Sequence, residues 1–194
     1  RRAYGKLKAD QILATKAADA ESATALLQAG VGADWADQDG NTPLIWAVRA
    51  GNSQIVDILL QRGADADVQD RLGRTALWHA AHEGNLPVLD SLLAQGLRGD
   101  LKDRDGHFPL CMAARQGHPD MVSALLDRGA ELHLTGKGAV DPLLLAASHG
   151  HSTVVQRLLA AIEDVDGRDD NGDTALMLAA QGGRTEVVRM LLQR

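Results

Sequence analysis

A stripe of aliphatic residues recurs along the chain at a fixed interval. Its first full example has apolar residues at positions i, i+1, i+4 and i+5, which lie on one face of a helix: Ile55, Val56, Leu59 and Leu60. The Leu-Leu pair that closes this stripe returns every 33 residues, beginning at positions 26, 59, 92, 125, 158 and 191. The pattern therefore predicts six amphipathic helices in a regular array.

A shorter helix is expected before each stripe. Thr42 is a suitable N-cap, Pro43 fits the first helical position, and Gly51 can end the helix with a positive φ. At the same interval Thr42 aligns with Thr75, Phe108, Asp141 and Thr174, and Gly51 aligns with Gly84, Gly117, Gly150 and Gly183. Phe108 cannot cap through its side chain, whereas Asp141 can.

Each unit thus reads as helix, turn, helix and a long hairpin-like loop. One such pair cannot bury its apolar stripe alone, so the units must stack side by side. We expect an all-α solenoid that forms one domain over residues 1–194. The expected units are a capping unit at about 1–38, followed by 39–71, 72–104, 105–137, 138–170 and 171–194.

Four segments carry a resemblance to a known family. They are GNTPLIWAVRAGN, GRTALWHAAHEGN, HFPLCMAARQGH and GDTALMLAAQGG. They resemble ankyrin repeats, which have a unit of about 33 residues and a T-P-L-H-x-A motif. The resemblance extends from about Lys6 to Arg194. It implies stacked helix-turn-helix units joined by hairpin-like loops, and a role in protein binding.

The chain departs from the family motif at the histidine of T-P-L-H. That position holds other residues in every unit: Ile45, Trp78, Cys111, Leu144 and Met177. In the family this histidine links adjacent loops by hydrogen bonds. We therefore expect packing or other groups to link the loops here.

Composition narrows the possible functions. Aromatic residues make up only 3% of the chain, so the core must consist of Leu, Val, Ile and Ala. The formal net charge of −6 argues against general nucleic-acid binding. No apolar run approaches the ~20 residues that span a bilayer, so no membrane role is expected. The single cysteine, Cys111, cannot form an internal disulfide, and a cytoplasmic location is expected.

No catalytic or metal-binding constellation stands out in the sequence. His79 and His82 have a spacing that two zinc ligands on a helix can have, but they do not form an H-E-x-x-H motif. They read better as surface or packing histidines. The aspartates of EDVDGRDDNGD lack the glutamate of a calcium loop and suit hairpin turns. We expect neither an enzyme nor a cofactor or metal.

Charge varies along the predicted hairpin tips and first helices. The tips are acidic or neutral near the start, basic through the middle and acidic again near the end. Trp and Arg are the residues that most often anchor interfaces, although Trp46 and Trp78 could instead serve inter-repeat packing and the arginines a solvated rim. The candidate partner-binding residues are Trp46, Arg49, Arg71, Arg74, Trp78, His82, Arg104, His107, Arg115 and Lys137.

The predicted function is a non-catalytic protein-binding module. A peptide or folded partner with an acidic segment would lie on the concave groove of hairpin tips and first helices. We expect a monomer that can be part of a longer chain. Two alternatives remain open: a targeting or regulatory arm of a larger enzyme or channel, and a bacterial effector or immunity-type inhibitor of one protein.

Overall fold

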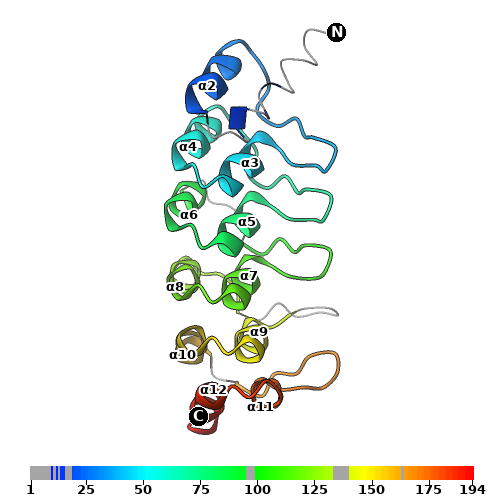
Figure 1. Cartoon of the computed structure of the whole chain (residues 1–194), viewed down its shortest axis with the longest axis vertical. Coiled ribbons are helices and arrows are strands. Elements are labelled where there is room, and N and C mark those ends of the chain that lie inside the picture. Colours follow the sequence, from blue (N-terminus) through cyan, green and yellow to red (C-terminus); the bar gives the residue numbers. More distant parts are fainter. Residues whose placement is uncertain are drawn as a thin grey trace. The chain divides into compact units, whose positions relative to one another are not determined.

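The computed structural model is all-helical, with eleven described helices stacked in sequential pairs (Figure 1). It describes residues 10, 12, 14, 15, 19–94, 99–132, 140–162 and 164–194. The predicted fold class is therefore confirmed. The sequence also predicts an irregular hairpin in the fifth unit, where Ala139 stands in place of the turn glycine, but Ala139 lies outside the described residues.

The chain divides into two compact units. The first contains residues 1–80 and 85–103, and the second contains residues 81–84 and 104–194. The first unit holds α2 (Ala20–Gln28), α3 (Pro43–Arg49), α4 (Ser53–Gln61), most of α5 (Ala76–Glu83) and α6 (Leu86–Leu93). The second holds α7 (Pro109–Gln116), α8 (Pro119–Asp127), α9 (Pro142–His149), α10 (Ser152–Ala161), α11 (Ala175–Gln181) and α12 (Thr185–Leu192).

The first helix of each pair begins where capping chemistry predicts. Thr42 Oγ1 accepts a hydrogen bond from the amide of Ile45 at 3.2 Å, and Thr75 does the same for Trp78 at 3.1 Å. Asp141 caps α9 by accepting from the amide of Leu143 at 2.7 Å. Phe108 makes no side-chain cap and is buried instead. The Phe108 ring therefore stabilises the fold by its burial in the core and not by capping the helix.

The aliphatic stripes of the second helices form the core. Ile55, Val56 and Leu59 of α4 are all completely buried. The matching residues of the later second helices are buried in the same way: Val88, Leu89, Leu92, Met121, Val122, Leu125, Val154, Val155 and Leu158. The hydrophobic period thus predicted the buried face of α4, α6, α8 and α10, whereas Leu192, which closes the stripe of α12, is 68% exposed.

The second helices are linked to the preceding repeat by side chains at their starts. His118 places Nε2 3.0 Å from the carbonyl oxygen of His82, and His151 places Nε2 2.9 Å from that of Arg115. Arg184 donates through Nε to the carbonyl of Ser148 at 3.2 Å. These carbonyls lie in the last turn of a first helix, where no helical N–H is available to them. Each side chain therefore caps the C-terminal end of the first helix in the repeat before it.

This arrangement explains the glycines that follow α5, α7 and α9, which are Gly84, Gly117 and Gly150. Gly117 has a φ of 77°, which favours glycine. A Cβ at Gly117 would also lie 2.5 Å from the imidazole of His151. Gly129 has nearly the same φ of 78°, but a Cβ there would meet no atom of the described residues within 4 Å. The first glycine is therefore needed for both conformation and space, and the second for conformation alone.

These two glycines give a matched test of the inter-repeat contact. We expect Gly129→Ala to lower the free energy of unfolding by about 1 kcal/mol, through left-handed strain alone. Gly117→Ala should lower it by about 2–3 kcal/mol, because it also displaces His151 from its carbonyl partner. Urea unfolding followed by circular dichroism measures both. Equal losses would mean that the His151 contact contributes nothing.

Candidate partner-binding surface

On α3 of the first unit, Arg49 is exposed and Trp46 is partly buried. The indole N–H of Trp46 donates to Asp37 Oδ2 at 2.9 Å. Burial raises the pKa of Asp37, but the hydrogen bonds from Trp46, Asn41 and Asp39 outweigh it and hold that pKa below its ordinary value. The guanidinium of Arg49 lies 4.4 Å from the Trp46 ring centroid, a cation–π distance. Trp46 is thus held at one edge and covered in part by an exposed Arg49.

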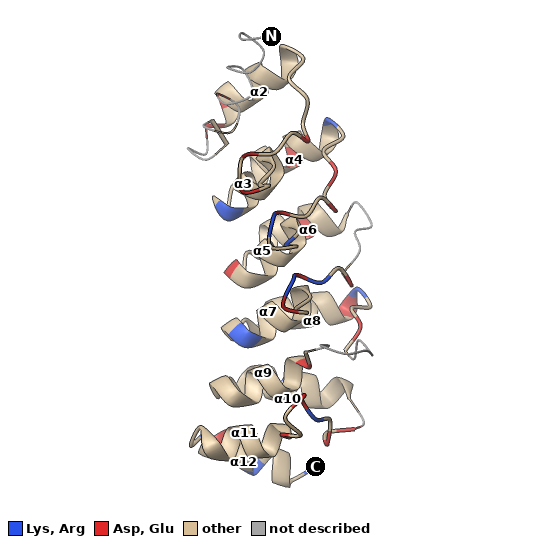
Figure 2. Ribbon diagram, turned by 90° about the vertical axis from the view of Figure 1, so that its right-hand side faces the viewer, with Lys and Arg blue, Asp and Glu red and all other residues tan. Residues whose placement is uncertain are grey.

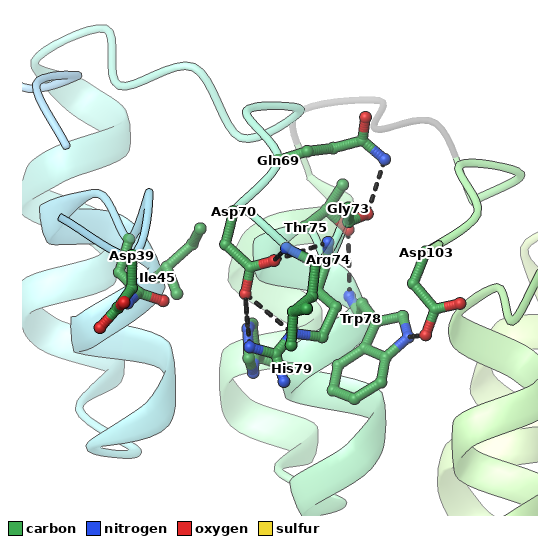
Figure 3. Close-up of polar contacts among 12 residues, drawn as sticks. Asp39, Ile45, Gln69, Asp70, Gly73, Arg74, Thr75, Trp78, His79 and Asp103 are labelled. Atoms are coloured by element: carbon green, nitrogen blue, oxygen red, sulfur yellow. Dashed lines mark hydrogen bonds and ion pairs between the residues drawn. The ribbon is translucent and has the colours of Figure 1, made fainter. Parts of the chain in front are cut away.

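The hairpin before α5 is organised by the buried carboxylate of Asp70 (Figure 3). Asp70 Oδ1 accepts from the amides of Leu72 at 2.8 Å and Arg74 at 3.0 Å. Asp70 Oδ2 accepts from Arg74 Nε at 2.8 Å and lies 2.8 Å from Arg74 Nη2. Burial raises the pKa of Asp70, yet these bonds and the Arg74 charge lower it overall. Arg74 is consequently committed to the hairpin itself.

His79 is a packing histidine of the same cluster. Its Nε2 lies 3.3 Å from Asp70 Oδ2, and the residue is only 4% exposed. Burial, followed by the Arg74 charge, lowers the pKa of His79 to about 4, although Asp70 opposes the shift. His79 is therefore neutral at pH 7, and its Nε2–H is assigned as the donor to Asp70. His82 faces another partner, with Nδ1 3.2 Å from Glu83.

Trp78 lies in the interior more than on the surface. Its relative exposure is 8%, and its indole N–H donates to Asp103 Oδ2 at 3.1 Å (Figure 3). The guanidinium of Arg74 lies 5.3 Å from its ring centroid. This geometry supports inter-repeat packing for Trp78 and leaves little of the indole for a partner.

The tip of the Asp70 hairpin is exposed at Arg71 and Leu72. Leu72 is 50% exposed, although it is large and apolar. The Arg71 amide donates to the Asp39 carbonyl at 2.9 Å, which fixes the backbone. The Arg71 side chain is exposed and makes no hydrogen bond or ion pair with any residue that the structure describes. A basic and an apolar side chain thus stand next to each other on a fixed backbone.

The second unit carries the remaining candidates. Arg104 and Arg115 are exposed, whereas His82 and His107 are partly buried. The Arg115 carbonyl accepts from His151, so α7 holds this arginine on a fixed backbone. Figure 2 shows basic residues at the ends of α3 and α7 and in the hairpins that precede α5 and α7. Lys137 lies outside the described residues.

Comparison with known proteins agrees with this geometry. A profile described as ankyrin repeats (3 copies) matches residues 11–70, 55–136 and 135–194. The chain belongs to the ankyrin repeat family. No curated protein matches it. Ankyrin repeats are generally protein–protein interaction modules and typically non-catalytic, and no catalytic domain is identified in this chain. None of the described helices is long and apolar enough to cross a bilayer.

Other groups replace the ankyrin motif histidine as links between loops. Trp78, at the histidine position, donates its indole N–H to Asp103 of the following loop. Cys111, also at that position, places Sγ 3.0 Å from the Val140 carbonyl. Gln69 adds a bond from its side-chain amide to the Lys102 carbonyl at 3.0 Å. The expectation that the loops are linked by other means is thus met by an indole, a thiol and an amide.

The hairpin aspartates are the ankyrin residues that sequence reasoning undervalued. Asp37, Asp70, Asp103 and Asp169 recur at multiples of 33 residues, which is the signal that could have identified them. Asp169 repeats part of the Asp70 pattern, accepting from the amides of Asn171 and Asp173 at 2.9 Å each. This role agrees with the prediction that the aspartates of EDVDGRDDNGD belong to a hairpin turn.

The pKa of His79 predicts a pH dependence of stability. Between pH 6.5 and about 4 the unfolded histidine binds a proton that the folded one does not, so stability falls as pH falls through this window. Across this window the free energy of unfolding should fall by about 3 kcal/mol because of His79. His79→Gln keeps a donor for Asp70 but does not titrate, so its unfolding free energy should fall less over the same window. Urea unfolding of both proteins at several pH values measures the difference, and identical slopes would contradict a buried neutral His79.

Proposed function

We propose that this ankyrin repeat protein is a non-catalytic binding module that recognises an acidic, partly apolar segment of a partner protein. The support comes from its exposed arginines on hairpin tips and first helices. In the first unit these are Arg49 and Arg71, and in the second they are Arg104 and Arg115. Charges at such positions steer association and select partners by complementarity.

The observation that carries the proposal is that Arg71 and Leu72 are neighbours and are both exposed at the hairpin tip. The Arg71 guanidinium makes no hydrogen bond or ion pair with a described residue, and Leu72 is 50% exposed. A carboxylate on the partner would pair with the Arg71 guanidinium, and an adjacent apolar side chain would cover Leu72. Because Asp70 and the Asp39 carbonyl already fix the backbone, binding would order little of the chain.

Trp46 and Arg49 add a second contact in the first unit. Arg49 is exposed and stacked on Trp46, which is itself held by Asp37. An arginine held over an aromatic ring loses less side-chain entropy when it pairs with a carboxylate. Arg74 plays a different part, because Asp70 already engages its guanidinium.

The titration behaviour of the described residues supports binding over catalysis. Asp19, Asp37, Asp70 and His79 are among the described groups with a shifted pKa. The three aspartates accept structural hydrogen bonds, and His79 is buried against one of them. Shifted groups in an enzyme are expected to meet in a cleft that admits substrate, and these serve caps and hairpins.

Charge reversal at Arg71 tests the proposal. A partner is first captured from a lysate of the source cell on the wild-type protein and identified by mass spectrometry. Calorimetric titration of that partner should then show about tenfold weaker binding for Arg71→Glu, with a smaller salt dependence. Arg62→Glu is the matched control, because Arg62 is exposed in the first unit but caps the second helix α4.

The two variants give a clear decision. Arg62→Glu should bind the partner as the wild type does, and both variants should keep the wild-type circular dichroism spectrum. If Arg71→Glu binds as tightly as Arg62→Glu, the basic hairpin tip is not the binding surface and the proposal fails.

A further inference from the structure

The second unit contains a hollow that the proposed function does not use. Its volume is about 340 Å³. Two hairpins and two first helices contribute to its wall, together with the residues that lead into α9. The lining residues are Asp105, Val140, Asp141, Leu144, Leu145, Ser148, Asp169, Asp170, Asn171 and Leu178.

The hollow combines apolar side chains with carboxylates. Leu144 and Leu145 come from α9 and Leu178 from α11, and Val140 precedes α9. Four aspartates lie among the same lining residues, whereas Lys, Arg and His do not occur in the set. An apolar surface edged by negative charge is complementary to a side chain with an aliphatic stem and a cationic end.

Two of these carboxylates have oxygens available for a ligand. Asp170 is exposed and makes no hydrogen bond or ion pair with a residue that the structure describes. Asp169 uses Oδ1 to hold its hairpin, while Oδ2 has no such bond within the described part. Asp141 differs, because its Oδ1 caps α9. The hairpin therefore presents two adjacent carboxylates on a fixed backbone.

We propose that this hollow binds an arginine side chain with an apolar neighbour, presented by a partner protein. The guanidinium carries five donors in a plane and can meet more than one carboxylate, which a lysine ammonium does less well. Its methylene groups would lie against Leu145 and Leu178, both of which are partly exposed. The volume is at the small end of the ~300–1,000 Å³ of ligand sites, which suits one or two side chains.

This inference goes beyond the proposed function and does not rest on it. The basic residues of the first unit favour an acidic segment, whereas the hollow of the second unit favours a basic one. Arg71 and Asp170 occupy equivalent positions three repeats apart, at residues 71 and 170. The same hairpin position thus carries opposite charge in the two units, and each preference can be tested separately.

Peptide binding followed by NMR tests the hollow directly. The probe is a short Gly/Ser-flanked peptide with a central Leu-Arg-Leu, titrated into the full ¹⁵N-labelled chain. Matched peptides carry citrulline, an uncharged relative of arginine, or glutamate in place of the arginine. We expect the arginine peptide to shift the amide signals of Leu145, Ser148 and Asn171, and to bind at least about threefold tighter than the citrulline peptide.

Asp170→Asn should lower the affinity of the protein for the arginine peptide by about threefold. Asp127→Asn is the matched control with the same loss of charge, because Asp127 is exposed in α8 and does not line the hollow. It should bind the peptide as the wild type does. At the amides of Leu145, Ser148 and Asn171, equal affinity for the arginine and citrulline peptides, tighter binding of the glutamate peptide, or an absence of shifts would each overturn the proposal. None of these outcomes depends on Arg71, so the two proposals can fail independently.

Discussion

A side chain at the start of a second helix makes a hydrogen bond to the end of the first helix in the repeat before it. This bond connects one repeat to the next. His118 and His151 make this bond to the carbonyls of His82 and Arg115. The bond satisfies a carbonyl that a helix end would otherwise leave open. It also requires the side chain to lie over the glycine that ends the first helix, which leaves no space for a Cβ. The contact recurs at the interval of the repeat, since His118 and His151 are 33 residues apart.

A second constraint acts in the hairpins, where an aspartate holds the backbone through amide hydrogen bonds. Asp70 does this in the first unit and Asp169 in the second. The side chain of the residue that follows makes no hydrogen bond or ion pair with a described residue. This residue is Arg71 in the first unit and Asp170 in the second. A rigid loop can therefore present either sign of charge at the same position. This separation of scaffold and variable residues fits the general use of ankyrin repeats in protein binding.

The replacement of the motif histidine shows that the link between loops matters more than the residue that makes it. Trp78 uses its indole N–H and Cys111 its thiol, and both reach the following loop. The sequence left Trp78 open between an interface anchor and inter-repeat packing, and it predicted no link between loops for Cys111. In the structure Trp78 is only 8% exposed, which favours packing between repeats.

The sequence by itself determined the repeat, the two helices of each unit, their caps and the buried stripe, because these depend on local hydrogen bonding and on the hydrophobic period. Asp141 as a cap and Ile55 as a core residue were predictable for this reason. The tertiary structure alone decided which polar side chains are already occupied. Arg71 and Arg74 look equivalent in the sequence, yet Asp70 engages only the guanidinium of Arg74. The hollow beside Asp170 likewise arises from residues on separate hairpins and helices, whose proximity is a product of stacking and not of sequence spacing.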